Sequence, residues 1–393
     1  MRRPRLVYVV THPVTADLLL RGQLSFMRER GFDVTVVAAP GELLDKVAAR
    51  EGVEVVAIPM ERSTELGGDL VAVARLTQLF RRIRPDIVNA GTTKGGLLGM
   101  MAARAASVPV RIYLLRGLRL ETVTGPMRAI LGVTERIASA CAHDVACVSR
   151  SLLRLSTEGG WIPHKKALVI GEGSSNGVDT ARFARTEELR AEGARRAALF
   201  GIGPEDRVVG FVGRLVADKG VRELLDAFAI VRREVPRAKL LLVGSDLGDQ
   251  AIDPELARAV RDAPGVVPTG HIADVAPFYA RMDVLAFPSF REGFPNTLLE
   301  AASASLPVVA FRSTGIVDAV VEGETGTIVD QRDSEALGRG IVAYLGSPEL
   351  SRAHGDAARA RATRVFSRDA VWGAWLAHYR TRLAARGLPE PAP

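Results

Sequence analysis

Two glutamates in the last third of the chain stand where carboxylates could recognise the hydroxyl groups of a ligand. A buried apolar run at 284–287 leads into a loop with Glu292 and Gly293, and a helix that begins near 295–296 carries Glu300 in its early turns. The start of a helix offers free N–H groups and partial positive charge to a pyrophosphate, and Gly293 lets the backbone approach a ligand closely. Carboxylates accept hydrogen bonds from sugar and ribose hydroxyls. We favour this functional interpretation over the alternative that both acids only complement a helix dipole or lie on the surface.

Two cations follow the first strand predicted for the second half of the chain. The sequence Gly-Arg-Leu-Val-Ala-Asp-Lys-Gly occupies 213–220, after an apolar run at 208–212 and before a helix predicted over 220–235. Arg214 and Lys219 therefore project from the carboxyl end of a strand beside a helix start, where they can neutralise a departing diphosphate. The same residues could be ordinary surface cations, but the strand–loop–helix context favours a phosphate site.

Polar side chains also follow predicted strands in the first half. His12 comes after the strand at 6–11, and Thr93 and Lys94 lie between the strand at 86–89 and the next helix. Because parallel strands end at a common edge, we expect these residues to face a cleft and predict a phosphate contact there. Two alternatives stay open: Lys94 could simply be solvated, and a lone histidine is more often structural.

The elements that position these side chains alternate between strand and helix. In the first half, strands are predicted at 6–11, 34–39, 53–58, 86–89, 110–115, 145–148 and 167–170, and helices at 18–30, 43–51, 70–83, 95–106 and 127–142. In the second half, strands are predicted at 208–212, 239–243, 283–287, 308–310 and 326–329, and helices at 220–235 and 275–281. Such alternation indicates parallel sheets, so the predicted fold class is α/β with two tandem Rossmann-like domains.

A charged stretch at 180–203 separates the two alternating patterns. We therefore predict one domain over 1–190 and a second over 200–366. A last helix with a frayed tail is predicted over 367–393, where Trp372 and Trp375 are candidate packing anchors. Open α/β sheets bind their ligands at the carboxyl ends of the strands, which is where the candidate residues of both halves fall.

The candidate motifs resemble those of a known family. The segment FPSFREGFPNTLLEAASASLPVVA, at 287–310, resembles the signature of the family 4 glycosyltransferases, and so do the Gly-Arg and Lys-Gly pairs of 213–220. The segments RGQLSFMRERGFDVTVVAAP, VNAGTTKGGLLGM and GSSNGVD are similar to the CapM-type capsular and exopolysaccharide branch of that family. The resemblance covers nearly the whole chain. It implies the GT-B fold, in which two Rossmann-like domains face each other across a cleft and the C-terminal helix crosses back.

The resemblance also assigns roles residue by residue. Arg214 and Lys219 would hold the diphosphate of a nucleotide-sugar donor in the C-terminal domain. Glu292, the third member of the catalytic set, would contact the donor sugar, and Glu300 would bind the nucleotide ribose. The donor site would be completed by Gly293, Phe294, Pro295, Asn296, Ser245 and Ile272, of which the last two stand where the family holds the base. On the acceptor side, in the N-terminal domain, the candidates are His12, Thr93, Lys94 and Arg116.

Arg116 departs from the family pattern. The family usually has a histidine after the strand at 110–115, and that histidine often contacts the donor sugar; we expect Arg116 to meet a phosphate of donor or acceptor instead. The first loop, at 11–17, also lacks the glycine pair that is frequent in the family. No residue is an obvious nucleophile. The resemblance implies retention. Without a nucleophile, it further implies attack from the face that the leaving group vacates, with the diphosphate taking the proton, and it implies neither a bound metal nor a cofactor.

Composition narrows the range of partners. The chain has 393 residues and a net charge of +7, and residues 101–166 hold ten Lys and Arg against four Asp and Glu. A local basic surface suits a polyprenyl-diphosphate-linked glycan at an anionic membrane, or it is the solvated face of an arginine-rich chain. Aromatic residues make up only 5% and no nucleic-acid motif accompanies the patch, so nucleic acid is not an expected partner.

The sequence predicts neither a secretory signal nor a membrane span. The apolar run at 6–10 is far too short for a signal, and no apolar stretch reaches the length that crosses a bilayer. Cys141 and Cys147 match no zinc or disulfide pattern, which suits a reducing compartment. We therefore expect a cytoplasmic protein, for which a peripheral position at the inner face of the plasma membrane would fit.

These observations predict a retaining glycosyltransferase that uses a nucleotide sugar, with a UDP-sugar favoured, and a lipid-linked glycan acceptor in capsule or exopolysaccharide synthesis. Three alternatives are kept: a transferase for a soluble small acceptor, a GT-B nucleotide-sugar epimerase, and a non-catalytic sugar-binding protein. The intact donor residues disfavour the last. A phosphorylase would need the context of a pyridoxal-phosphate lysine and a dehydrogenase a glycine fingerprint, and the sequence has neither.

Overall fold

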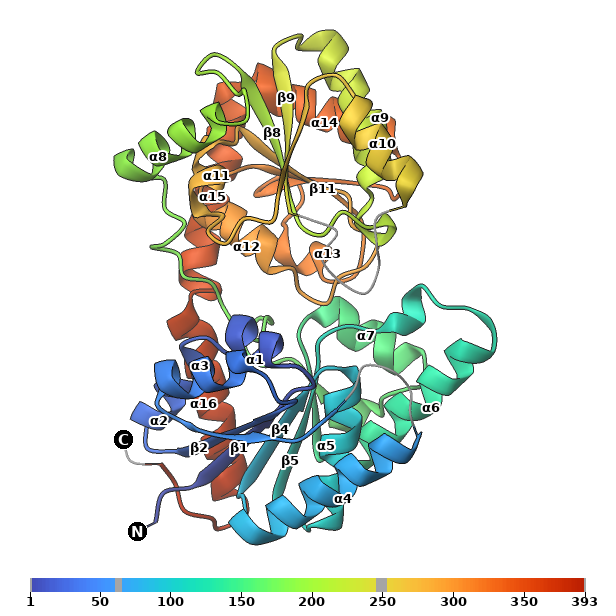
Figure 1. The fold of residues 1–393 in the computed structure, drawn as a ribbon, viewed down its shortest axis with the longest axis vertical. Coiled ribbons are helices and arrows are strands. Elements are labelled where there is room, and N and C mark those ends of the chain that lie inside the picture. The colour runs from blue at the N-terminus through green and yellow to red at the C-terminus, as the bar shows by residue number, and fades with distance from the viewer. Residues whose placement is uncertain (1, 61–65, 245–252, 392–393) are drawn as a thin grey trace. The chain divides into compact units, whose positions relative to one another are not determined.

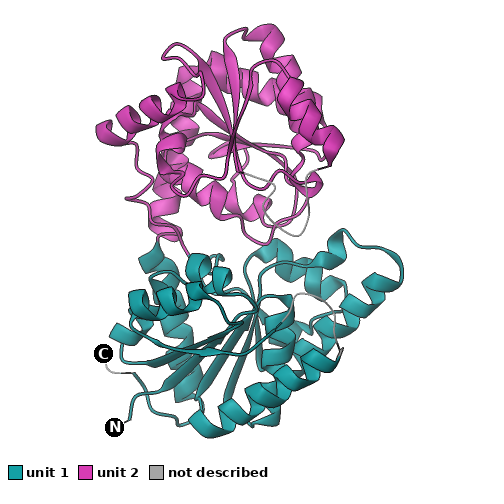
Figure 2. Ribbon diagram, viewed as in Figure 1, with its two compact units in different colours: residues 1–176, 368–393 teal, residues 177–367 magenta. Residues whose placement is uncertain are grey.

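The chain folds into two compact α/β units. The computed structural model describes residues 2–60, 66–244 and 253–391. Unit 1 comprises residues 1–176 and 368–393, and unit 2 comprises residues 177–367 (Figure 2). Each unit is built on a parallel sheet that carries helices (Figure 1), which confirms the fold class predicted from the alternation of strands and helices.

The sheet of unit 1 has the strand order β3-β2-β1-β4-β5-β6-β7. Its strands are β1 Arg5–Val9, β2 Asp33–Ala38, β3 Glu54–Ala57, β4 Ile87–Gly91, β5 Val110–Leu115, β6 Asp144–Cys147 and β7 Ala167–Leu168. Its helices are α1 Pro13–Leu19, α2 Gln23–Glu29, α3 Glu42–Glu51, α4 Leu66–Ile83, α5 Thr93–Ala105, α6 Gly125–Cys141, α7 Arg150–Glu158 and α16 Arg368–Ala384, with the 3-10 turns η1 Arg119–Glu121 and η2 His164–Lys166. All neighbouring strands are parallel, so the loops that follow them gather at one edge.

The sheet of unit 2 has the order β10-β9-β8-β11-β12-β13 and is also parallel. Its strands are β8 Arg207–Val212, β9 Ala238–Val243, β10 Val266–Gly270, β11 Val284–Phe287, β12 Val308–Phe311 and β13 Gly326–Val329. Its helices are α8 Glu187–Ala198, α9 Val221–Glu234, α10 Pro254–Asp262, α11 Ala276–Arg281, α12 Asn296–Ser303, α13 Ile316–Ala319, α14 Ser334–Gly346 and α15 Pro348–Val365, with the 3-10 turn η3 Ala217–Lys219.

Alternate residues of strand β8 show why both faces of the unit 2 sheet are covered. Val208 and Val212 belong to an apolar cluster with residues of α11 and α12, whereas Val209 and Phe211 belong to a second cluster with residues of α9 and α14. Successive side chains of a strand point to opposite faces, so a strand buried on both faces is a continuous apolar run. This packing holds the strand ends, and therefore the loops after them, in fixed positions.

The C-terminal helix α16 returns to unit 1, as the predicted crossing back of that helix requires. Trp375 and Tyr379 of α16 are buried, and Tyr379 packs edge-on against Phe32. The indole N–H of Trp372 donates to the carbonyl oxygen of Asn176 at 2.8 Å, where the chain first leaves the unit. The two predicted tryptophan anchors therefore both contact unit 1.

The single helix predicted over 18–30 is wrong. The structure has α1 and α2 in this region, and Gly22 between them adopts a left-handed conformation with φ 79°. The carboxylate of Glu51 accepts hydrogen bonds from the backbone N–H of Gly22 at 3.0 Å and of Ser25 at 3.2 Å. This distant acid therefore caps the start of α2 and stabilises the break. Sequence periodicity could not reveal the cap, because it comes from α3.

Candidate active site

The loops at the carboxyl edge of the unit 2 sheet are joined to one another. The loop after β8 meets the loop after β11, where the backbone N–H of Phe290 donates to the carbonyl oxygen of Asp218 at 3.0 Å. The hydroxyl of Ser313, after β12, donates to the carbonyl oxygen of Ser289 at 2.9 Å. Three loops that are far apart in the sequence thus form one surface, and the predicted donor residues Arg214, Lys219 and Glu292 lie on two of them.

Gly220 shows how closely these loops approach. It adopts φ +67°, and a Cβ atom at this position would lie 2.1 Å from the carbonyl oxygen of Pro288. A residue with a side chain would therefore meet both a conformational penalty and a steric clash. Gly315 is similar: it has φ +76°, and its Cβ would lie 2.2 Å from the carbonyl oxygen of Gly293.

Lys219 and Glu292 form an ion pair between two of these loops. The Nζ atom of Lys219 contacts the Oε1 atom of Glu292, and the two side chains are only 17% and 15% exposed. Partial burial weakens solvent screening, so each charge depends on the other more than it would at an open surface. The structure therefore brings together one predicted cation and one predicted acid.

A second ion pair lies directly beside the first. In the first pair the cation is on the loop after β8, whereas in the second pair it is on the loop after β11. Nη2 of Arg291 is 3.4 Å from Oδ2 of Asp218, so Asp218-Lys219 on one loop face Arg291-Glu292 on the other. Among the described residues, Oδ1 of Asp218 and Nε of Arg291 are buried and have no hydrogen-bond partner. The sequence interpretation gave Asp218 and Arg291 no role. The only signal for them is that each stands next to a candidate residue and carries the opposite charge.

Glu300 lies on α12, where Tyr279 of α11 holds its carboxylate. The Tyr279 hydroxyl donates to Oε2 of Glu300 at 2.8 Å. Burial raises the pKa of Glu300, and the hydrogen bond from Tyr279 acts in the opposite direction by stabilising the carboxylate. Tyr279 was not identified from the sequence, because α11 contacts α12 only through the tertiary fold.

Arg214 occupies the loop between β8 and η3, where its side chain is exposed. None of the ion pairs formed by the described residues includes Arg214. The neighbouring loop after β9 approaches closely, since a Cβ at Gly244 would lie 1.9 Å from the carbonyl oxygen of Gly213. Ser245 lies outside the described residues, and Ile272 is half-buried against an apolar cluster of unit 2.

The segment between Glu292 and α12 offers backbone groups. Gly293 and Pro295 are buried, and the ring of Phe294 packs at 5.0 Å from that of Phe366. Asn296 begins α12, and no side-chain hydrogen bond caps this helix at Pro295. The start of α9 at Gly220 also has no side-chain cap. Two uncapped helix starts therefore lie beside the Lys219–Glu292 pair, an arrangement suited to binding an anion.

The candidates in unit 1 have mainly local partners. His12 caps α1, because its Nδ1 accepts a hydrogen bond from the backbone N–H of Val14 at 3.2 Å. Thr93 is exposed at the first position of α5. The Nζ atom of Lys94 is 2.7 Å from Oδ1 of Asp69 on α4. The structure thus places these three residues at the carboxyl edge of the unit 1 sheet.

Arg116 follows β5 at the same edge and reaches into the turn at 174–176. Its Nη1 donates to the Ser175 hydroxyl at 2.5 Å and to Oδ1 of Asn176 at 2.8 Å. Its Nε atom is buried without a hydrogen-bond partner among the described residues. Burial lowers the pKa of Arg116 to about 10, so the guanidinium stays protonated near neutral pH. Arg116 therefore holds the turn through which the chain leaves unit 1.

No cluster suited to a metal ion is found where the structure describes the chain. None of the groupings of His, Cys, Asp and Glu in residues 2–60, 66–244 and 253–391 could supply three ligands to one ion.

Comparison with known families identifies both halves of the chain. The family profile described as "Glycosyl transferase 4-like domain" matches residues 20–173, and the profile described as "Glycosyl transferases group 1" matches residues 206–347. The second segment includes the loops after β8 and β11 that carry Lys219 and Glu292.

Individual proteins similar to this chain point the same way. The capsular polysaccharide biosynthesis glycosyltransferase CapM of Staphylococcus aureus is 35% identical over 383 residues, which cover 98% of each sequence. HepE of Anabaena, solved in complex with UDP-glucose, is 20% identical with a TM-score of 0.79 and covers 96% of this chain and 99% of its own. Sucrose-phosphate synthase of Thermosynechococcus elongatus is 19% identical with a TM-score of 0.80 and covers 98% of this chain and 100% of its own. These two structures share the fold of this chain.

Proposed function

Because this chain belongs to the family 4-like glycosyltransferases and is itself a glycosyltransferase, we propose that it transfers a sugar, with retention, from a nucleotide sugar to a hydroxyl of a lipid-linked glycan. The product would belong to a capsule or exopolysaccharide. Similarity to CapM along the full chain supports this pathway, and the UDP-glucose complex of HepE, which has the same fold, supports a UDP-sugar donor.

The observation that carries the proposal is the cluster of four charges on the loops after β8 and β11. Lys219 and Glu292 are paired there, with Asp218 and Arg291 beside them and uncapped helix starts on either side. We propose that the donor diphosphate binds at this cluster, where Lys219 and the exposed Arg214 neutralise it. Glu292 then becomes available to the hydroxyls of the donor sugar.

The remaining donor contacts are assigned to α12, to the segment before it and to two residues proposed for the base. Glu300 accepts hydrogen bonds from the ribose hydroxyls, and the hydrogen bond from Tyr279 keeps its carboxylate in one orientation. The backbone of Gly293, Phe294, Pro295 and Asn296 surrounds the sugar. Ile272 and Ser245 are proposed to contact the base. On the acceptor side, His12, Thr93 and Arg116 are the proposed contacts, whereas Lys94 is held by Asp69.

The chemical step needs no protein nucleophile. The bond between the anomeric carbon and the diphosphate oxygen breaks, and the acceptor oxygen bonds to the same face of that carbon. The acceptor proton passes to the departing diphosphate, whose growing negative charge Lys219, Arg214 and the helix starts stabilise. The transition state is oxocarbenium-like, so stabilising the leaving group is the main task of the protein.

A donor panel tests this proposal. The purified protein is incubated with UDP-, GDP- and dTDP-sugars, with and without a membrane extract, and nucleotide release and glycolipid products are followed by mass spectrometry. We expect release of one nucleotide that depends on the extract and yields a lipid-linked product with the anomeric configuration of the donor. A product formed only on soluble acceptors, or a donor converted to its epimer, would contradict it.

A further inference from the structure

Helix α6 turns an apolar face outward. Met127, Ile130, Val133 and Ile137 are 50%, 53%, 51% and 40% exposed, although all four are large apolar side chains. At 3.6 residues per turn the last three lie on one side of the helix. The opposite side, with Gly132, Glu135, Ala138 and Ser139, is buried. Surface helices normally direct polar residues to the solvent, so this orientation needs an explanation.

Cations accompany this apolar stripe along its length. Arg128 and Arg136 lie on α6 itself and are exposed. At the end of the helix, Nη1 of Arg104 donates to the carbonyl oxygen of Ala140 at 3.4 Å. Lys165 is exposed beside Lys166, whose Nζ donates to the carbonyl oxygen of Ala142 at 2.7 Å. The stripe is therefore flanked by positive charge.

Acidic residues of the same region are withdrawn from the surface. Glu135 is 4% exposed and accepts a hydrogen bond from the Tyr113 hydroxyl at 2.8 Å. Asp144 is 6% exposed and pairs with Arg382 at 2.9 Å. Two of the four acids in residues 101–166 thus do not reach the solvent. Three of the ten cations in the same range are also only partly exposed, so the exposed side chains keep the excess of positive charge that the sequence shows.

We propose that α6 docks unit 1 on an anionic phospholipid bilayer. We call its outward face the α6 surface: Met127, Ile130, Val133 and Ile137, with the exposed Arg136 at its edge. The apolar side chains would enter the boundary between headgroups and acyl chains, and the cations would contact lipid phosphates. None of the helices in the described segments is long and apolar enough to cross a membrane, so α6 lies on the bilayer rather than in it.

The position of α6 connects this surface with the acceptor. The helix begins at Gly125, after η1 and the loop that follows β5, so its first turn lies at the sheet edge that carries Arg116. Docking would bring that edge to the lipid surface. The link between docking and catalysis rests on the proposed function, because a position at the membrane helps transfer only if the acceptor is lipid-linked.

A second copy of the chain is the other partner that could cover an apolar helix face. A two-fold contact places the same surface of both copies together, so Arg136 at its edge would meet only apolar side chains and like charge. No exposed acid on α6 would offset this repulsion, since Glu135 is buried. The charges therefore favour the anionic bilayer.

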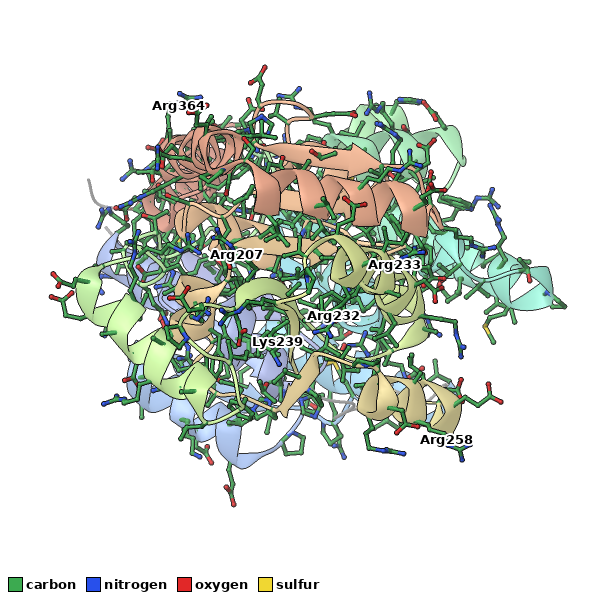
Figure 3. The ribbon with its side chains drawn as sticks, turned by 90° about the horizontal axis from the view of Figure 1, so that it is seen from above. Arg207, Arg232, Arg233, Lys239, Arg258 and Arg364 are labelled. Atoms are coloured by element: carbon green, nitrogen blue, oxygen red, sulfur yellow. The ribbon has the colours of Figure 1, made fainter. Side chains whose placement is uncertain are left out.

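Sedimentation of the full chain with vesicles tests the proposal. The vesicles contain either phosphatidylcholine alone or an equal mixture with phosphatidylglycerol. The apolar variant replaces Ile130, Val133 and Ile137 by Gln, a good helix former, so that α6 is kept. The charge variant is Arg136→Glu with Lys165→Glu. Its matched control is Arg233→Glu with Arg364→Glu, two exposed arginines of unit 2 that are labelled in Figure 3.

We expect the unchanged chain to sediment with the anionic vesicles and not with phosphatidylcholine. The apolar variant should lose this binding, and the charge variant should bind at least about tenfold more weakly, since each surface cation contributes about a fivefold change. The control should bind like the unchanged chain. Wild-type binding by the apolar variant would overturn the proposal, as would a dimer of the unchanged chain that the apolar variant abolishes in analytical ultracentrifugation.

UDP titration by calorimetry separates this proposal from the proposed function. All variants should bind UDP as the unchanged chain does, because the α6 surface belongs to unit 1 and the proposed donor loops to unit 2. If vesicle binding behaves as expected but no lipid-linked product forms, the proposed acceptor is wrong and the docking surface stands. If the product forms in vesicles with the apolar variant at the full rate, the docking role is wrong and the proposed function stands.

Discussion

Lys219 is the residue on which the proposed chemistry depends. Its ammonium is paired with Glu292 in a partly buried position, and Asp218 and Arg291 form a second ion pair beside the first. We propose that a donor diphosphate replaces Glu292 as the partner of Lys219, and that the Glu292 carboxylate then accepts hydrogen bonds from sugar hydroxyls. The same pair thus keeps the cation in place before the donor arrives.

Replacing Lys219 by Ala should lower kcat about a hundred- to a thousandfold, because one preorganised charge at the leaving group is removed. The fold should survive, because Lys219 lies in a loop and belongs to neither apolar cluster of unit 2. Nucleotide release under saturating donor measures the effect, and circular dichroism checks the fold. Lys46→Ala, at an exposed position of α3, is the matched control and should leave kcat unchanged. Near-normal turnover of Lys219→Ala would remove the phosphate role.

Glu135 should make the stability of unit 1 depend on pH. Burial raises its pKa to about 7, above its ordinary value of 4.5. Between these values the folded chain holds a proton that the unfolded chain has released, so stability falls as pH rises through this window. The loss is at most on the order of 3 kcal/mol for a shift of this size.

The variant Glu135→Gln isolates this effect. Its stability relative to the unchanged chain should rise from about pH 5 to about pH 8, because the amide does not ionise. Urea unfolding at several pH values measures the difference. Parallel stability curves for the two proteins would show that Glu135 is ionised in the folded state throughout.

At the scale of elements, the fit between the loops after β8 and β11 decides whether the donor cluster forms. Gly220→Ala should destabilise the chain by about 1–3 kcal/mol and weaken UDP binding, because its Cβ meets the backbone of Pro288. Gly201→Ala is a matched control with a similar φ of +75° but nothing within 4 Å of its Cβ. It should cost only the conformational penalty, about 1 kcal/mol, and leave UDP binding unchanged. Equal effects of the two variants on UDP binding would contradict the account.

Much of the element pattern could be predicted from the sequence. Apolar runs buried on both faces, such as Val208–Val212 within β8, stand out because their neighbours are charged. Strand β10 was missed because it is only half-buried and contains Pro268, which is unusual inside a strand. Helices α14 and α15 were also missed. The exposed side of α15 is rich in Arg and Ala, which leaves little apolar periodicity to detect.

The partners within the candidate site could not be predicted. Lys219 and Glu292 were selected because each follows a strand and precedes a helix start. The contact between them joins positions 73 residues apart and depends on the neighbouring placement of β8 and β11. The hydrogen bond from Tyr279 to Glu300 likewise depends on packing between α11 and α12. Local patterns indicate which residues reach a sheet edge, whereas pairing is a property of the tertiary structure.

At the scale of the whole molecule, the chain leaves unit 1 at Asn176 and returns to it at Arg368. Deletion of residues 368–393 should therefore unfold unit 1, because it removes the buried side chains of Trp375 and Tyr379. Hydrogen exchange should show lost protection in β1 and β4 while the strands of unit 2 keep theirs. Deletion of residues 387–393 alone is the control and should leave protection unchanged. Intact protection of β1 in the longer deletion would show that α16 is dispensable.

The most direct test of the donor site is a crystal structure of the chain with a UDP-sugar that it accepts. The account predicts that the diphosphate contacts Lys219 and Arg214, that the Lys219–Glu292 pair is broken, and that the ribose hydroxyls contact Glu300. A nucleotide bound away from the loops after β8 and β11, with Lys219 still paired to Glu292, would contradict it.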